Sequence, residues 1–306
     1  MKKVLVTGGT VFVSRYVAEY YVRKHYDVYV LNRNTKPQSE GVRLIEADRH
    51  CLGDALKQHH FDVVIDVTAY NETDIHDLLD GLGSFDDYIL ISSSAVYPEH
   101  CAQPFSEDTP IGENRIWGAY GMGKVKAERA LQAHVPNAYI LRPPYLYGPM
   151  NNVYREAFVF DCALQDRKFY LPGNGELGLQ FFHVEDLCRF MDCLLEHHPS
   201  ETVYNVGNSN TVSAKEWVEL CYQAAGKRPV FVTVDPAIEQ RKFFSFYAYD
   251  YCLDVSKMQK LMPATMPLAD GLRDAFAWYC THADLVNKKP YTEYIDAQLA
   301  DPTDEC

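Results

Sequence analysis

The sequence predicts an α/β fold: a doubly wound parallel sheet with a smaller, mostly helical C-terminal lobe. Two observations support this prediction. Short apolar runs alternate with longer amphipathic segments, and this order of strand, helix and strand builds a parallel sheet. The apolar runs are mostly continuous, which is typical of strands that helices cover on both faces. With 306 residues, the chain is long enough for one large domain or for two that share a core.

The apolar runs and the amphipathic segments give the expected elements in order. The expected strands are Lys3–Thr7, Val28–Leu31, Val42–Glu46, Asp62–Val67, Tyr88–Ser92, Tyr139–Leu141 and Thr202–Asn205. The clearest expected helices are Val13–Lys24, Glu72–Leu82 and Gly121–His134. After about residue 143, prolines and glycines become frequent and helical patterns dominate. We therefore expect one domain over residues 1–150 and a second lobe over 151–306, with a strand near 202–206 that returns to the first sheet.

Composition excludes several classes of function. The net charge of −13 argues against nucleic acid as the main partner, because phosphate binding needs a concentrated basic face. The apolar runs are far shorter than the roughly 18 residues of a membrane span. The nine cysteines lack paired spacing, so we expect reduced thiols in a cytoplasmic protein. We expect no metal site, since the His59-His60 and His197-His198 pairs would point apart on a helix.

The turn after the first strand, "VTGGTVFVS", lies where a Rossmann-like fold holds the pyrophosphate of a dinucleotide. The three positions that are usually glycine are Gly8, Val11 and Ser14. Ser14 is small enough for close helix–strand packing, whereas Val11 could crowd the phosphates while keeping helical angles. The helix N-terminus still offers N–H groups and a positive dipole end. A cofactor turn and an ordinary strand–helix turn both remain open on this evidence.

The ends of the next two strands carry candidate ligands of an adenosine. Asn32 occupies the position where a carboxylate usually binds the ribose of NAD, and Arg33 follows it. Arg33 could pair with a 2′-phosphate or stack on adenine, which leans slightly toward NADP. Asp48, after the third strand, could accept the adenine amino group or cap a helix. The cofactor prediction is therefore NAD or NADP.

Proton-transfer chemistry is suggested by Tyr120 and Lys124 in "AYGMGKVKAERAL". Four residues apart on a helix, the two side chains share one face, and an ammonium lowers the pKa of a nearby phenol. The same spacing occurs at Tyr20 and Lys24, which we assign to helix packing and solvated charge. Tyr120 is favoured by the serine run in "ILISSSAVYP", a strand followed by a polar loop, where a hydroxyl could orient the reacting oxygen.

Several motifs occur together and in order: "TGGT", "SSSAVY", "YGMGK", "LRPPYLYGP", "FFHVEDL" and "YNVGN". As a set, they resemble the extended short-chain dehydrogenases/reductases over residues 1 to about 280. The branch that the chain resembles most is the NAD-dependent epimerase/dehydratases that act on nucleotide sugars. The resemblance implies Tyr120 as catalytic acid/base, Lys124 as its modulator and a ribose ligand, and Ser93 as the hydroxyl, with Ser94 as a near alternative.

The resemblance also implies the remaining site residues. The cofactor would be held by Gly8, Thr10, Val11, Phe12, Asn32, Arg33, Asp48, Ala69, Lys124 and Pro143. The substrate would be held by Ser94, Tyr145, His183 and Arg241, with Asp186 supporting the substrate lobe. Family members often dimerise through two helices, one of which carries the tyrosine, so a homodimer is expected.

Two departures from the family pattern separate the possible functions. Dehydratases of this family carry an Asp-Glu pair where this chain has Ser94 and Ala95, which cannot move those protons. A related branch that begins "TGGT" includes plastid RNA-binding members, but it generally lacks the Tyr/Lys pair. We therefore favour a nucleotide-sugar epimerase that uses transient hydride transfer. A reductase or dehydrogenase of a keto-sugar or other carbonyl is the alternative, followed by a non-catalytic NAD(P)- or RNA-binding protein.

Overall fold

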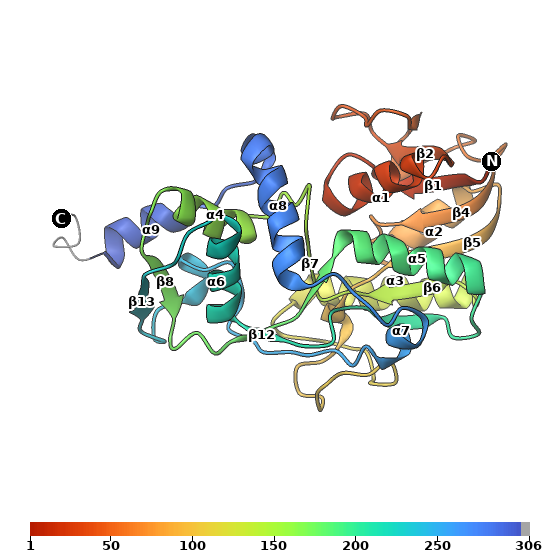
Figure 1. The fold of residues 1–306 in the computed structure, drawn as a ribbon. Coiled ribbons are helices and arrows are strands. Elements are labelled where there is room, and N and C mark those ends of the chain that lie inside the picture. Colours follow the sequence, from red (N-terminus) through yellow and green to blue (C-terminus); the bar gives the residue numbers. More distant parts are fainter. Residues whose placement is uncertain (301–306) are drawn as a thin grey trace. The chain divides into compact units, whose positions relative to one another are not determined.

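The computed structural model describes residues 1–300, which form two compact units (Figure 1). The first unit consists of Met1–Leu146, Phe181–Ser209 and Leu253–Thr265. The second consists of Tyr147–Gln180, Asn210–Cys252 and the chain from Met266 onward. The chain therefore enters the second unit three times, and the expected returning strand near 202–206 lies in a segment of the first unit between two of these entries. The last six residues of the lobe expected over 151–306 lie outside the described residues.

The first unit is built on a seven-stranded sheet in the order β11-β6-β5-β4-β1-β2-β3, with every neighbouring pair parallel. The strands are β1 (Lys3–Thr7), β2 (Asp27–Asn32), β3 (Arg43–Glu46), β4 (His60–Asp66), β5 (Ser84–Ile91), β6 (Tyr139–Arg142) and β11 (Val203–Asn205). All seven predicted strands are confirmed: β1 has the predicted bounds, and the other six have shifted ends. The strand order reverses between β1 and β4, the point at which doubly wound sheets bind ligands.

Helices cover both faces of this sheet, as the continuous apolar strands require. The helices of the first unit are α1 (Phe12–Arg23), α2 (Glu72–Gly81), α3 (Gly118–His134), α5 (Val184–His197) and α7 (Ser256–Leu261). Helices α2 and α3 pack together over one core, which includes Leu5, Val64, Leu78 and Leu131, all fully buried. The predicted α/β fold with a doubly wound parallel sheet is confirmed.

Helix α1 packs against α5 through the second Tyr-x-x-x-Lys pair. Tyr20 Oη and Lys24 Nζ both donate to Asp192 Oδ2 of α5, at 2.5 and 2.6 Å. Burial and the neighbouring carboxylate raise the pKa of Tyr20, which is opposite to what a proton-transfer tyrosine needs. These contacts support the assignment of Tyr20 and Lys24 to helix packing. They also explain why α5, far along the chain, belongs to the first unit.

The second unit is mostly helical, with two small two-stranded sheets. Its helices are α4 (Glu156–Leu164), α6 (Ala214–Ala224), α8 (Leu268–His282) and α9 (Tyr291–Gln298). Its strands are β8 (Phe169–Pro172) with β13 (Phe231–Val234), and β9 (Gly178–Leu179) with β12 (Val212–Ser213). A buried carboxylate, Asp161 of α4, accepts hydrogen bonds from Tyr154, Tyr279 and Lys288 at 2.7, 2.5 and 2.8 Å.

Candidate active site

The β1–α1 turn has the form of an anion-binding turn. Gly8 and Gly9 take φ angles of +91° and +90°, a region that suits glycine. The turn is fixed to β2 by two bonds: Gly8 N donates to Leu31 O at 2.9 Å, and Asn32 Nδ2 donates to Gly8 O at 2.7 Å. The positive φ angles and these bonds give the turn a defined shape directly in front of α1.

The expectation that Val11 keeps helical angles is wrong. Val11 is the extended N-cap of α1, with φ −138° and ψ 134°, which suits a β-branched residue. The helix begins at Phe12, a buried residue whose φ of +35° is strained for a bulky side chain. Ser14 Oγ donates to Val11 O at 2.9 Å. Because the side chain of Val11 cannot cap and the first turn carries no acidic residue, the positive end of α1 fits the diphosphate of a dinucleotide.

The predicted adenosine ligands lie at the ends of β2 and β3 and are bound to the protein itself. Arg33 Nη1 lies 3.9 Å from Asp48 Oδ2, and both side chains are exposed. Asp48 also caps the short helix η1 (Arg49–Cys51) by accepting from His50 N at 3.0 Å. The helix-cap role that the sequence left open for Asp48 is therefore observed.

Helix α3 carries Tyr120 and Lys124, and it brings Lys124 to the carboxyl ends of β4 and β5. Tyr120 is 44% exposed, whereas Lys124 is 2% exposed. Lys124 Nζ donates to Ala69 O at 2.7 Å, after β4, and to Ile91 O at 2.9 Å, the last residue of β5. Burial lowers the pKa of Lys124 to about 8. The ammonium is thus held between two strand ends, and its charge changes close to neutral pH.

Two glycines in "YGMGK" allow this close approach of α3. A Cβ on Gly121 would lie 2.5 Å from Ala95 O, in the loop that carries Ser93. A Cβ on Gly123 would overlap Tyr70 O, in the loop after β4. The glycines therefore let one helix contact the loops after both β4 and β5, and this places Tyr120 against the Ser93 loop.

Replacing Gly123 with alanine is expected to push α3 away from Tyr70 and to destabilise the protein by about 1–3 kcal/mol, as overpacking does. Gly112→Ala is the matched control. A Cβ at Gly112 would meet only Pro98 Cγ, at 3.6 Å, so its effect should stay within about 0.5 kcal/mol. Urea unfolding followed by circular dichroism measures both, and equal stabilities would contradict the close contact at Gly123.

Ser93 follows β5 and begins the short helix η2 (Ser94–Val96), where its Oγ accepts from Ala95 N at 3.1 Å. Ser93 is partly exposed, whereas Ser94 is 5% exposed. Ser94 N donates to Pro143 O at 2.9 Å, so the loops after β5 and β6 are joined. Of the two predicted hydroxyls, Ser93 is the more accessible.

A buried ion pair lies beneath this loop. Arg142, at the end of β6, donates through Nη2 to Glu128 Oε2 of α3 at 2.6 Å, with side chains 5% and 0% exposed. Ser92 Oγ donates to Glu128 Oε1 at 2.5 Å. Arg142 Nη1 donates to Tyr97 Oη at 2.8 Å, and Tyr97 donates to Asn205 Oδ1 of β11 at 2.7 Å. The network therefore joins α3, β6 and β11 to the residues on both sides of Ser93.

Tyr70 lies beside Tyr120, and further aromatic contacts begin at Trp117 in the same segment of the chain. The Tyr70 ring centroid lies 6.4 Å from that of Tyr120, and Lys124 Nζ lies 4.9 Å from the Tyr70 centroid. Trp117, three residues before Tyr120, lies 6.4 Å from the predicted substrate residue Tyr145. Tyr145 in turn lies 6.0 Å from Phe181. Tyr120 therefore has an aromatic neighbour in Tyr70, and a chain of aromatic contacts runs from Trp117 through Tyr145 to the buried Phe181.

The remaining predicted substrate residues fall in different units. His183 caps α5 in the first unit, is fully buried, and has its pKa lowered to about 4 by burial. Arg241 belongs to the second unit, where it donates to Ser245 O and lies 4.6 Å from the Tyr247 ring. Asp186, in the first turn of α5, is fully buried and accepts from Arg189 at 2.8 Å.

Thr10 and Phe12 lie in the β1–α1 turn with Gly8, and Ala69 and Pro143 lie at the carboxyl ends of β4 and β6. The structure therefore brings most predicted cofactor and catalytic residues to one edge of the sheet. Sequence reasoning missed Asp66, Arg49, Glu128, Arg142 and Tyr70. Two of these carried a readable signal, because Asp66 and Arg142 are charged residues at the ends of otherwise apolar strands.

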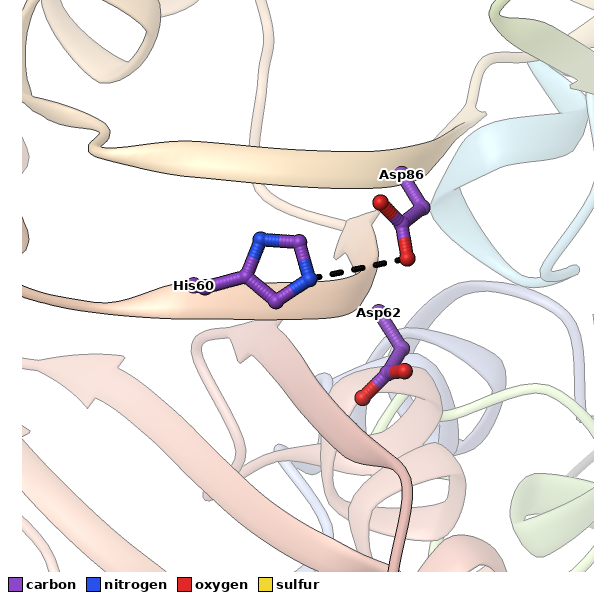
Figure 2. Close-up of side chains that lie close together, drawn as sticks. All are labelled: His60, Asp62 and Asp86. Carbon is purple, nitrogen blue, oxygen red and sulfur yellow. Dashed lines mark ion pairs between the residues drawn. The ribbon is translucent and has the colours of Figure 1, made fainter.

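His60 lies in a strand, whereas the sequence suggested an exposed polar loop or a helix end. It begins β4, and Figure 2 shows its ring directed toward Asp86 of β5, with Nε2 3.5 Å from Asp86 Oδ2. With Asp62 these side chains offer donor atoms within 4.8 Å of one another. Asp62 already accepts from Lys3 N at 2.6 Å. The group lies where β4 and β5 begin, at the edge of the sheet opposite the candidate site, and we assign it no role there.

Comparisons with known proteins agree with this geometry. Residues 4–207 match the family described as "NAD dependent epimerase/dehydratase family". The chloroplast stem-loop binding protein of 41 kDa b from Arabidopsis thaliana is 25% identical over 301 residues, which cover 90% of this chain and 78% of that protein. The dTDP-glucose 4,6-dehydratase of Streptomyces griseus is 27% identical over 269 residues, covering 83% and 78%.

A solved structure shows the same fold. The UDP-glucuronic acid 4-epimerase of Bacillus cereus, in complex with UDP-glucuronic acid and NAD, superposes with a TM-score of 0.70 at 20% identity, covering 90% of this chain and 98% of that one. Among residues 1–300, every helix is too short or too polar to span a bilayer. The family match covers most of the first unit and confirms the resemblance in the motifs. The chain therefore belongs to the NAD dependent epimerase/dehydratase family, an enzyme family of the extended short-chain dehydrogenase type.

Proposed function

We propose that the protein is an NAD(P)-dependent epimerase of a nucleotide sugar. The observation that carries the proposal is the placement of Tyr120 and Lys124 by α3 against the Ser93 loop, at the same sheet edge as the Gly8–Gly9 turn. Charged and hydroxyl groups at this edge converge where doubly wound sheets bind ligands. A bound dinucleotide would supply the acceptor and donor of hydride.

The chain's own residues divide the proton chemistry. Tyr120 removes the proton from a sugar hydroxyl and later returns it. Ser93 Oγ donates a hydrogen bond to the same oxygen and holds it in place. The buried Lys124 ammonium stabilises the phenolate form of Tyr120, because an opposite charge nearby favours the ionised form. The aromatic rings of Trp117 and Tyr145 exclude water from one side of the reacting carbon.

The other predicted ligands enter the proposal with distinct roles. The α1 N-terminus would hold the diphosphate of the cofactor, with Asn32, Arg33 and Asp48 at its adenosine end. Arg33 is the reason to test NADP beside NAD, since its guanidinium is exposed. His183 is buried and so would support the substrate site, and Arg241 stays a predicted substrate ligand within the second unit. The same proposal includes a homodimer in the cytoplasm, in keeping with the free thiols of the eight cysteines within residues 1–300.

One feature of the chain favours epimerisation over dehydration. Ser94 and Ala95 cannot remove or deliver the protons that a dehydratase moves. We expect UDP-sugars incubated with the protein to yield the C4 epimer, detected by proton NMR, without net change in nicotinamide absorbance at 340 nm. Stoichiometric change in that absorbance would instead identify the reductase alternative.

Native mass spectrometry of the purified protein tests the same point independently and reports the oligomer. An epimerase returns the hydride and keeps its cofactor, so tightly held NAD or NADP is expected.

A second candidate, RNA binding, is favoured by the plastid stem-loop binding relative, which matches 90% of this chain. The net charge of −13 opposes it. Filter binding with a stem-loop RNA at physiological salt should give no retention; tight retention without sugar turnover would overturn the epimerase proposal.

A further inference from the structure

A charge pair that is largely shielded from solvent, Asp66 with Arg49, lies between the β1–α1 turn and helix α3. Asp66, the last residue of β4, is 0% exposed, and its Oδ2 accepts from Arg49 Nη2 at 2.5 Å and from Tyr88 Oη at 2.7 Å. Its Oδ1 accepts from Thr7 Oγ1 at 2.8 Å. Burial alone would raise the pKa of Asp66, but Arg49 and these hydrogen bonds hold it below its usual range. The carboxylate is therefore charged.

The pair connects the cofactor turn to the loop after β4. Thr7 directly precedes Gly8, and its Oγ1 accepts from Val67 N and Thr68 N at 3.0 and 3.1 Å. Arg49 Nη1 donates to Thr68 Oγ1 at 3.0 Å. Asp66 thus orients Thr7, while Arg49 holds Thr68. The next residue, Ala69, is therefore fixed from two directions.

Ala69 is also the residue whose carbonyl receives Lys124. Lys124 Nζ lies 2.7 Å from Ala69 O and stacks over the ring of Tyr70, the following residue. A displacement of this short loop would move the ammonium with it. We propose that Asp66 and Arg49 are positioning residues, which hold the Ala69 carbonyl, and through it Lys124, in register with the Gly8–Gly9 turn. This inference rests on the proposed function, in which Lys124 serves both Tyr120 and the cofactor.

Asp66 and Arg49 affect Lys124 through their charges as well as through its position. Burial is the main influence on the pKa of Lys124 and lowers it, while the carboxylates of Asp66, Glu128 and Asp74 raise it and Arg49 lowers it. These groups come from β4, α3, α2 and η1, and the phenols of Tyr70 and Tyr120 complete the titratable surroundings. Removing Asp66 or Arg49 should therefore shift the protonation of Lys124 in opposite directions, which a merely structural role would not do.

The test uses protein labelled with 13Cε-lysine, in which the Cε resonance of Lys124, assigned by its loss in Lys124→Arg, is followed against pH. Asp66→Asn is expected to lower the pKa of Lys124 and Arg49→Gln to raise it, each by about 1 pH unit. Tyr88→Phe is the matched control, because it removes a neutral hydrogen bond from the same carboxylate and should leave that pKa in place. If Asp66→Asn and Arg49→Gln shift the pKa of Lys124 in the same direction, or if neither shifts it beyond experimental error, the inference is overturned.

The double variant Asp66→Asn/Arg49→Gln guards against misfolding, since it removes both buried charges together. Its Lys124 should titrate near the wild-type value. Because Ala69 is no longer fixed, NAD+ and NADP+, each titrated by calorimetry, should bind about tenfold more weakly than to the wild type. Unchanged affinity for NAD+ and NADP+ would contradict the positioning role of Asp66 and Arg49. The NMR titration needs neither cofactor nor substrate, so it can fail or succeed independently of the epimerase assay.

Discussion

Tyr120→Phe is expected to lower turnover of the nucleotide sugar by roughly 10²–10⁴-fold, the usual contribution of a positioned acid/base group. The variant keeps the ring, its position 6.4 Å from Tyr70 and the helix that carries it, and loses only the hydroxyl. Cofactor binding should therefore stay within about twofold of the wild type, because we assign it to the α1 N-terminus and Lys124. Steady-state turnover and calorimetric titration with NAD+ and NADP+ measure the two effects separately.

The chain supplies a matched control in its second Tyr-x-x-x-Lys pair. Tyr20→Phe removes the same hydroxyl from the same spacing, but Tyr20 bonds to Asp192 between α1 and α5. This variant should keep full turnover and lose about 1.5–3 kcal/mol of stability, the contribution of a hydrogen bond to a charged group. Equal turnover losses in the two tyrosine variants would contradict the role of Tyr120. They would mean that its surroundings do not distinguish it from Tyr20, which has the same spacing to a lysine.

The second large effect is expected at the buried ion pair of Glu128 and Arg142. Replacing Arg142 with Met leaves the Glu128 carboxylate uncompensated at 0% exposure, which should cost about 3–5 kcal/mol. The double variant Glu128→Met/Arg142→Met removes both charges and should recover most of that loss, since apolar residues of similar volume replace such pairs at little net cost. Urea unfolding monitored by tryptophan fluorescence and circular dichroism measures all three proteins.

An exposed ion pair provides the comparison for this experiment. Lys227 Nζ lies 2.6 Å from Asp166 Oδ1, with side chains 42% and 72% exposed. Lys227→Met should change stability by less than about 1 kcal/mol, because solvent screens the interaction.

Turnover by the double variant Glu128→Met/Arg142→Met tests a second role of the buried pair. Since Glu128 accepts from Ser92, next to Ser93, its loss should lower turnover even where the fold is stable. Wild-type turnover in that variant would show that the network does not position the Ser93 loop.

Much of the first unit could be predicted because its elements are specified locally. Val4, Leu5 and Val6 form a continuous apolar run, and all three are fully buried in β1, as a strand covered on both faces requires. The Asp48 cap could also be read from the sequence, since an aspartate before a short helix has a local hydrogen-bond partner. Val11 was misread for the same local reason: its neighbours suggest a helix, but its β-branched side chain favours the extended N-cap.

The candidate site could be predicted only in part. Tyr120 and Lys124 are four residues apart on one helix, so their common face follows from the helical repeat. The partners of Lys124 do not: Ala69 and Ile91 lie 55 and 33 residues away and reach it through sheet pairing. The same holds for Arg49 and Asp66, and for Glu128 and Arg142, which are ordinary charged residues until the fold buries them together.

By itself, the sequence determined the fold class, the strands after which the candidate site residues come, and the residues proposed to transfer a proton. It could do so because periodicity and motif spacing are properties of neighbouring residues. The sequence already favoured Tyr120 and Lys124 over Tyr20 and Lys24, and the tertiary structure added the partner, Asp192, that binds the second pair. The tertiary structure also decided which charges are buried in pairs around Lys124. The physical reason is that burial and ion pairing join residues that are distant in the chain, and desolvation, which sets the pKa of a lysine, exists only once those residues have come together.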